Sequence, residues 1–267
     1  SEGEHTMRIA RVDVHGEAHD AIIEGDIAYH LEGSPFENPH RGAAIGPVAG
    51  LKLLAPCQPT KIVCIGLNYK AHIEETNATA PTSPLMFFKP PTAVVGHEDD
   101  VHWIPGTEQM DYESELALVF KKKAKFVEPG TYRDYVLGYT CANDISARDF
   151  QRGDGQWTRG KGSDTFCPLG PWIVTDIDGE DLHIGGALNG EVRQDSRTSD
   201  LLFGLDELVV HVTKYFTMLP GDVIITGTPS GVGTSKGLMK PGDVYEVTIE
   251  GIGTLRNRIV GVHGEVA

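Results

Sequence analysis

Short apolar runs that alternate with polar residues dominate the first part of the chain, and glycines separate them. Such alternation has the period of a β-strand, in which successive side chains point to opposite faces. It predicts three short strands, at residues 8–12, 21–23 and 27–29. Because the breaks between these strands are tight, we expect a small antiparallel unit at the N-terminus.

A Pro/Gly-rich stretch over residues 33–50 follows, and we assign no strand to it. The apolar run 61–65 then predicts a buried strand that begins a larger domain. We therefore place the boundary close to Ala55 and Pro56. The expected division is a small N-terminal domain over residues 7–57 and a main domain over residues 58–267.

The rest of the chain predicts more strands than helices. A short helix is expected over 68–76, and a longer one over 205–218. The apolar residues that recur on one face of the longer helix, and are expected to be buried, are Leu205, Leu208, Val209, Val212, Tyr215 and Phe216. Strands are expected at residues 115–120, 136–141, 172–175, 222–226 and 244–249. This order favours a β-rich α+β fold over a regular alternation of strands and helices.

Composition and charge narrow the function. The chain has 267 residues, enough to bury a large core, and its formal net charge of -15 would repel the phosphate backbone of nucleic acid. No apolar run approaches the roughly 18 residues that span a bilayer, and no segment resembles a secretion signal. We expect a cytoplasmic protein without nucleic-acid or membrane partners, and residues 1–6 are expected to be a remnant of recombinant production.

The four cysteines favour neither zinc nor disulfides. None of them has the Cys-x-x-Cys spacing, and their neighbours are mostly apolar. Buried, reduced thiols are therefore expected at Cys57, Cys64, Cys141 and Cys167.

Two acids lie close together where a strand is predicted. If residues 113–120 are extended, Glu113 and Glu115 share one face, about 6.5 Å apart at their Cα atoms. A solvent-facing pair is the common explanation of such a pattern. Here, however, both faces of the strand are apolar beyond the acids. Two neighbouring acids in such a place repel each other unless a cation neutralises them.

A third acid, Asp144, follows the next predicted strand. It could cap a short helix, or it could complete a metal site with Glu113 and Glu115. Three carboxylates are hard oxygen ligands, which favour Mg²⁺ or Mn²⁺, and also Ca²⁺, over zinc. The residues alone suggest this site and leave both explanations open.

A glycine-rich segment invites a competing interpretation. Residues 155–162 nearly spell a phosphate-binding loop, but Gly162 stands where a Ser or Thr should reach Mg²⁺. No apolar strand comes directly before Gly155. A nucleotide-binding function is therefore not favoured.

Six segments together resemble the fumarylacetoacetate hydrolase family, in its bacterial two-domain branch, and the match runs from about residue 61 to 262. The segments are 65–72 (IGLNYKAH), 87–90 (FFKP), 111–115 (DYESE), 143–149 (NDISARD), 161–166 (KGSDTF) and 226–233 (TGTPSGVG). The resemblance implies a β-sandwich roll with a small N-terminal domain, a homodimer, and a divalent metal on Glu113, Glu115 and Asp144.

The same resemblance assigns further residues. His72 and Glu75 match a base dyad, and a helix after residue 68 would independently bring these i and i+3 side chains together. Lys161 matches a catalytic lysine, although it also belongs to a run of basic residues that could lie on the surface. Substrate-side positions are matched by Arg148, Gln151 and Thr228, and ordinary turn chemistry would explain the glycines beside Thr228 equally well.

The implied reaction is hydrolysis of a C–C bond in a small 2,4-dioxo acid, such as an acylpyruvate, with His72 activating water. The same site could isomerise diacids of aromatic-compound breakdown or decarboxylate oxaloacetate, because these reactions share an enolate. A family relative that kept the fold and lost the chemistry is the alternative of another class. Residues 73–84 are expected to form a mobile lid that sets substrate size.

Overall fold

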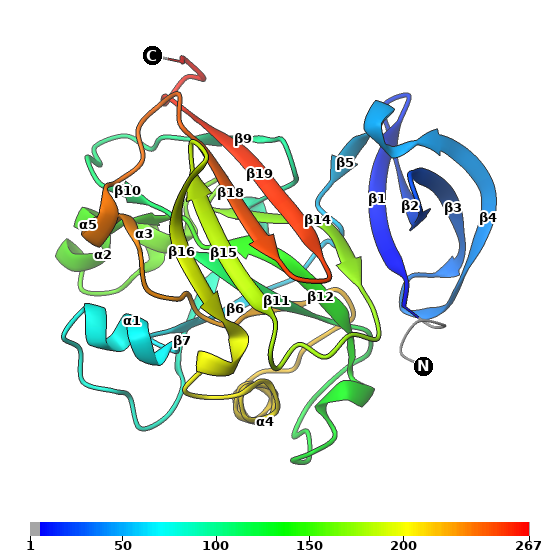
Figure 1. The fold of residues 1–267 in the computed structure, drawn as a ribbon. Coiled ribbons are helices and arrows are strands. Elements are labelled where there is room, and N and C mark those ends of the chain that lie inside the picture. The colour runs from blue at the N-terminus through cyan, green and yellow to red at the C-terminus, as the bar shows by residue number, and fades with distance from the viewer. Residues whose placement is uncertain (1–5, 267) are drawn as a thin grey trace.

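The N-terminal strands form a curled lobe beside the main body (Figure 1). The computed structural model describes residues 6–266, so residues 1–5 of the expected N-terminal remnant lie outside the described part. β1 pairs antiparallel with β2, and β2 with β3, as the short alternating runs predicted, and β1 also pairs with β5. The strands of the lobe are β1 (Arg8–Val14), β2 (Glu17–Glu24), β3 (Ile27–Ser34), β4 (Glu37–Pro47) and β5 (Lys52–Leu54).

Two of these strands, β4 and β5, were not predicted from the sequence pattern. β4 occupies most of the Pro/Gly-rich stretch to which no strand was assigned, and it pairs with β3 through several register shifts. None of its residues is fully buried. Its side chains therefore carry no apolar alternation, and the strand depends on backbone pairing instead.

The lobe and the main body share one sheet, because β1 also pairs with β14. The sheet has 12 strands, in the order β4-β3-β2-β1-β14-β12-β11-β17-β6-β7, with β5 on β1 and β8 on β14. Its strands in the main body are β6 (Ile62–Gly66), β7 (Leu85–Lys89), β8 (Val94–Val95), β11 (Ser114–Phe120), β12 (Val136–Asn143), β14 (Cys167–Val174) and β17 (Val223–Ile225).

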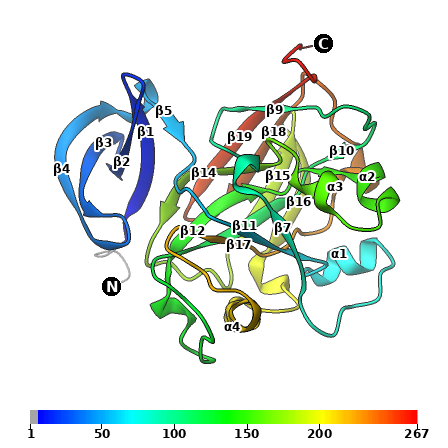
Figure 2. The same cartoon turned by 180° about the vertical axis from the view of Figure 1, so that it is seen from behind.

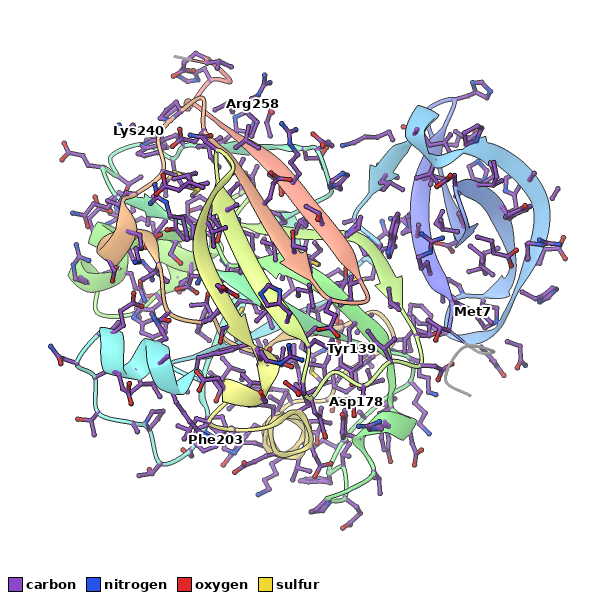
Figure 3. The ribbon with its side chains drawn as sticks, in the orientation of Figure 1. Met7, Tyr139, Asp178, Phe203, Lys240 and Arg258 are labelled. Carbon is purple, nitrogen blue, oxygen red and sulfur yellow. The ribbon has the colours of Figure 1, made fainter. Side chains whose placement is uncertain are left out.

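A second sheet of five strands lies across β11, β12 and β14, and side chains fill the space between the layers (Figures 1 and 3). Its order is β16-β15-β18-β19-β9. These strands are β9 (Asp100–His102), β15 (His183–Leu188), β16 (Glu191–Arg197), β18 (Val244–Ile249) and β19 (Gly253–Val260), and a small separate pair is formed by β10 (Met110–Asp111) and β13 (Ser146–Ala147). The predicted β-rich α+β fold is confirmed.

Strand β11 is covered on both faces. Leu116, Leu118 and Phe120 belong to the core between the two sheets, whereas Ala117 and Val119 belong to the core on the other side. All five side chains are fully buried. The alternation read from the sequence is therefore correct, and the acids that precede it lie at the edge of a dry region.

The helices are short and lie around the edges of the sheets, as the view from behind shows (Figure 2). α4 buries Leu205, Leu208, Val209 and Val212, as predicted, but it ends at Tyr215 because Phe216 takes an extended backbone. Tyr215, expected on the buried face, is exposed. The helices are α1 (Lys70–Glu75), α2 (Arg148–Gly153), α3 (Thr158–Gly162), α4 (Leu205–Tyr215) and α5 (Gly233–Lys236), and the 3-10 turns are η1 (Val48–Gly50), η2 (Pro91–Ala93), η3 (Tyr132–Asp134) and η4 (Thr198–Asp200).

Two further expectations were tested by the fold. All four cysteines are free and buried, and burial raises the pKa of Cys57 and of Cys167 to about 12, so these thiols remain protonated and unreactive. Over residues 6–266, no helix has the length and apolar character needed to cross a membrane.

Candidate metal centre and active site

Three carboxylates meet where β11 and β12 lie side by side. Glu113 comes directly before β11, Glu115 is its second residue, and Asp144 follows β12. The antiparallel register pairs Ser114 with Asn143, so the N–H of Asp144 donates to the carbonyl of Glu113 at 2.9 Å. One oxygen from each of the three acids lies within 4.8 Å of the others, and all three residues are buried.

The surroundings of Glu115 fit a divalent cation. Its Oε1 accepts a hydrogen bond from the N–H of Gly227 at 2.6 Å, but its buried Oε2 has no hydrogen-bond partner among the described residues. Burial, together with the charges of Asp144 and Glu113, raises the pKa of Glu115 well above its usual range. A buried oxygen without a donor is costly, and a hard cation would satisfy it.

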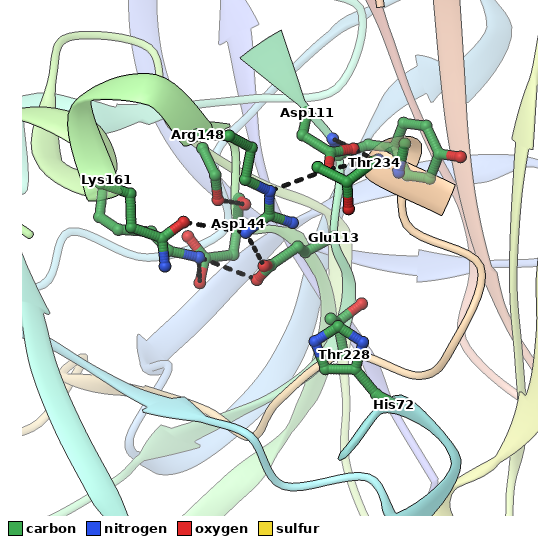
Figure 4. Close-up of polar contacts among 12 residues, drawn as sticks. His72, Asp111, Glu113, Asp144, Arg148, Lys161, Thr228 and Thr234 are labelled. Atoms are coloured by element: carbon green, nitrogen blue, oxygen red, sulfur yellow. Dashed lines mark hydrogen bonds and ion pairs between the residues drawn. The ribbon is translucent and has the colours of Figure 1, made fainter. Parts of the chain in front are cut away.

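Lys161 and Arg148, both buried, contact the carboxylates (Figure 4). Lys161 Nζ lies 3.1 Å from Glu113 Oε2 and 3.3 Å from Asp144 Oδ2, and Arg148 Nη1 lies 2.9 Å from Glu113 Oε1. Burial raises the pKa of Glu113, but Lys161 and Arg148 outweigh it and hold that pKa well below its usual range. Burial likewise opposes the charge of Lys161, yet Asp144 and Glu113 raise the pKa of Lys161, which stays an ammonium.

Asp111 is a fourth buried acid to which sequence reasoning assigned no role. It accepts a hydrogen bond from Arg148 Nε at 2.9 Å and another from the N–H of Gly233 at 2.7 Å. Asp111 therefore links Arg148 to the start of α5. Thr234, the second residue of α5, lines a cavity together with Arg148 (Figure 4). The sequence feature that could have pointed to Asp111 is its place in the DYESE motif, two residues before Glu113.

His72 and Glu75, the pair expected to act as a base dyad, have the geometry that helical spacing predicted. His72 Nδ1 lies 3.0 Å from Glu75 Oε2, and the N–H of Gly231 donates to Glu75 Oε1 at 2.9 Å. Burial raises the pKa of Glu75, but the hydrogen bonds from His72 and Gly231 outweigh it and lower that pKa. A carboxylate at Nδ1 favours the tautomer with its proton there, which leaves Nε2 as the basic nitrogen.

Thr228 lies in the cavity wall, but its hydroxyl is already engaged. It donates to the carbonyl of Ser114 at 3.0 Å and accepts from Gln194 Nε2 at 2.8 Å. Because a hydroxyl has one proton, this side chain has none to donate to a substrate. Gln194, a buried residue that the sequence did not reveal, thereby fixes Thr228 relative to β11.

Arg148 and Gln151 come from the first turns of α2. Arg148 Nη1 donates to Gln151 Oε1 at 3.0 Å, whereas the buried Nη2 of Arg148 has no hydrogen-bond partner among the described residues. An unpaired guanidinium N–H group is suited to an acceptor such as a carboxylate. The possible surface cluster of basic residues is divided: Arg148 and Lys161 are buried, whereas Arg152 and Arg159 are exposed.

These groups surround a cavity of about 240 Å³. Glu75, Glu115 and Asp144 are not among the residues that line it. Two larger cavities, of about 830 Å³ against β7 and about 500 Å³ beside β4, are not lined by Glu113, Glu115 or Asp144. Of the residues singled out from the sequence, those lining the cavity are His72, Glu113, Arg148, Gln151, Lys161 and Thr228.

The glycine-rich segment does not form a phosphate-binding loop. The short helix α2, and not a strand, comes before it, and its second half is the short helix α3. The buried Lys161 of this helix contacts carboxylates instead of an open anion site. The near match to the nucleotide-binding motif is therefore coincidental.

Comparison with known proteins decides the family. Residues 61–260 match the C-terminal domain of fumarylacetoacetate hydrolase, and residues 7–56 match an Rv2993c-like N-terminal domain. The chain belongs to the fumarylacetoacetate hydrolase family. The resemblance inferred from the six motifs is thus confirmed, and the protein is an enzyme of this family.

Individual relatives cover most of the chain. Protein Rv2993c of Mycobacterium tuberculosis is 41% identical over 95% of this chain and 98% of its own. Human mitochondrial oxaloacetate tautomerase FAHD2A is 40% identical over 80% of this chain and 71% of its own. A crystal structure of 2-hydroxyhepta-2,4-diene-1,7-dioate isomerase from Mycobacterium marinum, 41% identical, superposes with a TM-score of 0.88 over 96% of this chain and 98% of the other.

Proposed function

We propose that the protein catalyses metal-dependent keto–enol proton transfer on a small 2-oxo dicarboxylic acid of oxaloacetate type. One observation carries the proposal. His72, held by Glu75, shares a cavity of about 240 Å³ with Lys161 and with Glu113, which contacts both Lys161 and Arg148. A base and an enolate-stabilising site therefore face the same small space.

The three carboxylates would hold a divalent cation such as Mg²⁺ or Mn²⁺. When bound, that cation supplies a Lewis acid toward the 2-oxo group and the neighbouring carboxylate. In the ionised state, Asp111 and the three carboxylates exceed the buried cations Lys89, Arg148 and Lys161 by one charge. A divalent cation would reverse that sign, so the loaded site suits an anionic substrate.

Residues of the chain supply the proton transfer. Nε2 of His72 takes a proton from the carbon next to the 2-oxo group, and Glu75 keeps the ring oriented and stabilises its charged form. The ammonium of Lys161 stabilises the negative charge on the substrate oxygen. The protonated ring then delivers this proton to the enolate oxygen. In the reverse direction Nε2 takes the proton of the enol hydroxyl and returns it to carbon, so no water is consumed.

The far end of the substrate is proposed to contact Arg148 and Gln151. The unpaired Nη2 of Arg148 suits a second carboxylate, and the cavity volume suits a short diacid better than a long one. The names of the tautomerase and isomerase relatives describe reactions that move protons within such acids.

A second candidate is hydrolysis of the C–C bond of an acylpyruvate. The same dyad favours it, because His72 Nε2 could take a proton from water instead of from carbon. The two reactions differ in whether a bond between carbons breaks, so their products distinguish them. Decarboxylation of oxaloacetate would also break such a bond, and it would release pyruvate.

The test compares products with one enzyme preparation and either Mg²⁺ or Mn²⁺. Enol oxaloacetate is followed by its ultraviolet absorbance, and pyruvate is measured with lactate dehydrogenase and NADH in oxaloacetate and acylpyruvate reactions. We expect faster decay of the enol without pyruvate. Pyruvate formation from an acylpyruvate, with no effect on the enol, would favour the hydrolase. Pyruvate from oxaloacetate would favour the decarboxylase.

A further inference from the structure

Lys89 is a buried cation to which the sequence assigned no role, although it lies in the FFKP motif. It is the last residue of β7, at the edge of the large sheet, and only 1% of its surface is exposed. Its Nζ lies 2.7 Å from Asp144 Oδ1 and donates to the carbonyl of Ile145 at 3.0 Å. It also donates to the carbonyl of Lys161.

The ammonium of Lys89 is enclosed by oxygens of the protein and not by the substrate cavity. An ammonium has three protons, and three oxygens surround this one: a carboxylate and two backbone carbonyls. Lys89 is also absent from the residues that line the catalytic cavity. Its effect on the reaction must therefore act through Asp144 and Lys161.

We propose that Lys89 is a positioning residue for the metal centre. By holding Oδ1 of Asp144, it leaves Oδ2, the oxygen near Lys161, directed toward the other two carboxylates. By holding the carbonyl of Lys161, it fixes the end of α3 that carries the catalytic ammonium. This inference rests on the proposed function, because it assumes that the carboxylates bind a divalent cation.

Positioning and simple electrostatics predict opposite results. Removing a positive charge beside a cation site should strengthen cation binding if Lys89 acts only through its charge. Removing a group that orients a ligand should weaken binding, and loss of such outer contacts typically costs about 10- to 100-fold in metal affinity. The sign of the change therefore separates the two roles.

Lys61 supplies a matched control. Its Nζ lies 2.6 Å from the buried carboxylate of Asp222, so it also pairs with a buried aspartate, but neither residue lines the catalytic cavity. Replacing Lys61 by Met removes a lysine–aspartate pair without touching the metal centre. A loss of stability shared by both variants is thus distinguished from an effect on the metal.

The experiment titrates Mn²⁺ into chelator-stripped parent, Lys89→Met and Lys61→Met proteins by calorimetry, with circular dichroism and thermal melts alongside. We expect Mn²⁺ affinity to fall about 10- to 100-fold in Lys89→Met and to remain at the parental value in Lys61→Met. At saturating Mn²⁺, kcat for enol decay should also fall in Lys89→Met, because Lys161 is displaced. If Lys89→Met does not fold, Lys89→Gln, which keeps one donor for Asp144, takes its place in the same titration.

Unchanged or tighter Mn²⁺ binding by the folded Lys89 variant would overturn the positioning role while leaving the metal site intact. A parent protein that binds no Mn²⁺ would overturn both this inference and the proposed function. Because binding is measured without substrate, a wrong choice of reaction cannot produce either result.

Discussion

The side chains of Asp222 and Glu115 are both buried, but the chain provides them with very different numbers of hydrogen-bond donors. Asp222, in the turn before β17, accepts hydrogen bonds from the N–H groups of Thr60 and Leu219 and from the hydroxyl of Thr60, and it pairs with Lys61. Glu115 has one donor for one oxygen and none, among the described residues, for the other.

The difference shows how a buried carboxylate that stabilises the fold can be distinguished from one that binds a ligand. The donors around Asp222 come from two chain segments, residues 60–61 and residue 219, so this carboxylate holds the start of β6 against the turn before β17. The carboxylates around Glu115 instead repel one another, and the fold itself provides too few donors. A buried charge that the chain satisfies stabilises the fold, whereas one that it leaves unsatisfied indicates an external partner.

Metal removal should have the largest effect on activity. Dialysis against EDTA is expected to abolish turnover, because the site would lose its Lewis acid and its carboxylates would repel one another. Restoring Mg²⁺ or Mn²⁺ should recover it, as measured by the decay of the enol absorbance. Full activity in protein shown by elemental analysis to be metal-free would be inconsistent with the account.

Loss of the base should have the next largest effect. His72→Ala is expected to lower kcat/KM by roughly 10²- to 10⁴-fold, the usual contribution of a positioned base. Mn²⁺ affinity should stay close to the parental value, because the residues that could hold the metal are Glu113, Glu115 and Asp144, and His72 is not one of them. Turnover near the parental rate in this variant would remove His72 from the mechanism.

The structural acid should affect stability and not chemistry. Asp222→Ala leaves the N–H groups of Thr60 and Leu219 without this acceptor and Lys61 without its partner, so it should lower the free energy of unfolding by about 1–3 kcal/mol in urea titrations. The folded variant should bind Mn²⁺ as the parent does. A clear loss of Mn²⁺ affinity would show that the two acidic sites are not independent.

The smallest effect concerns the pH dependence of stability without metal. Burial raises the pKa of Asp222, but Lys61 and Thr60 outweigh it and lower that pKa, so its contribution is present above the unfolded pKa and is lost as pH falls through the lowered value. The raised pKa of Glu115 acts oppositely, since its contribution is present below the unfolded pKa and is lost as pH rises toward the raised value.

Thermal melts of chelator-stripped protein check this contrast. Glu115→Gln should flatten the loss of stability with rising pH, and Asp222→Asn should flatten the loss with falling pH. Added Mn²⁺ should raise the melting temperature of the parent more at pH 8 than at pH 5, because the cation competes with the proton on Glu115. Equal Mn²⁺ effects at both pH values would show that Glu115 is ionised without the metal.

Much of the site could be predicted because its geometry is local. Period-2 alternation was enough to place Glu113 and Glu115 together, and helical spacing was enough for His72 and Glu75. Asp144 follows the strand that comes next in the sequence, but the residues alone left a helix cap open, and the family resemblance assigned it to the metal site. Each of these deductions needs only one element or one antiparallel pair.

The parts that the sequence did not reveal depend on distant segments. Lys89 reaches Asp144 from β7, at the far edge of the sheet order, and Gln194 reaches Thr228 from the second sheet. Strand β4 was missed because its exposed side chains show no apolar alternation. Sheet order and backbone pairing are set by the whole fold, and no local pattern records them.

The central claim is that Glu113, Glu115 and Asp144 bind a divalent cation. The most direct test is a calorimetric titration of Mn²⁺ into chelator-stripped parent and Glu115→Gln proteins, both checked for folding by circular dichroism. The account predicts saturable binding at a single site per chain in the parent, and much weaker binding in Glu115→Gln because a neutral amide replaces a charged ligand. Equal affinity in the two proteins, or no binding by the parent, would contradict it.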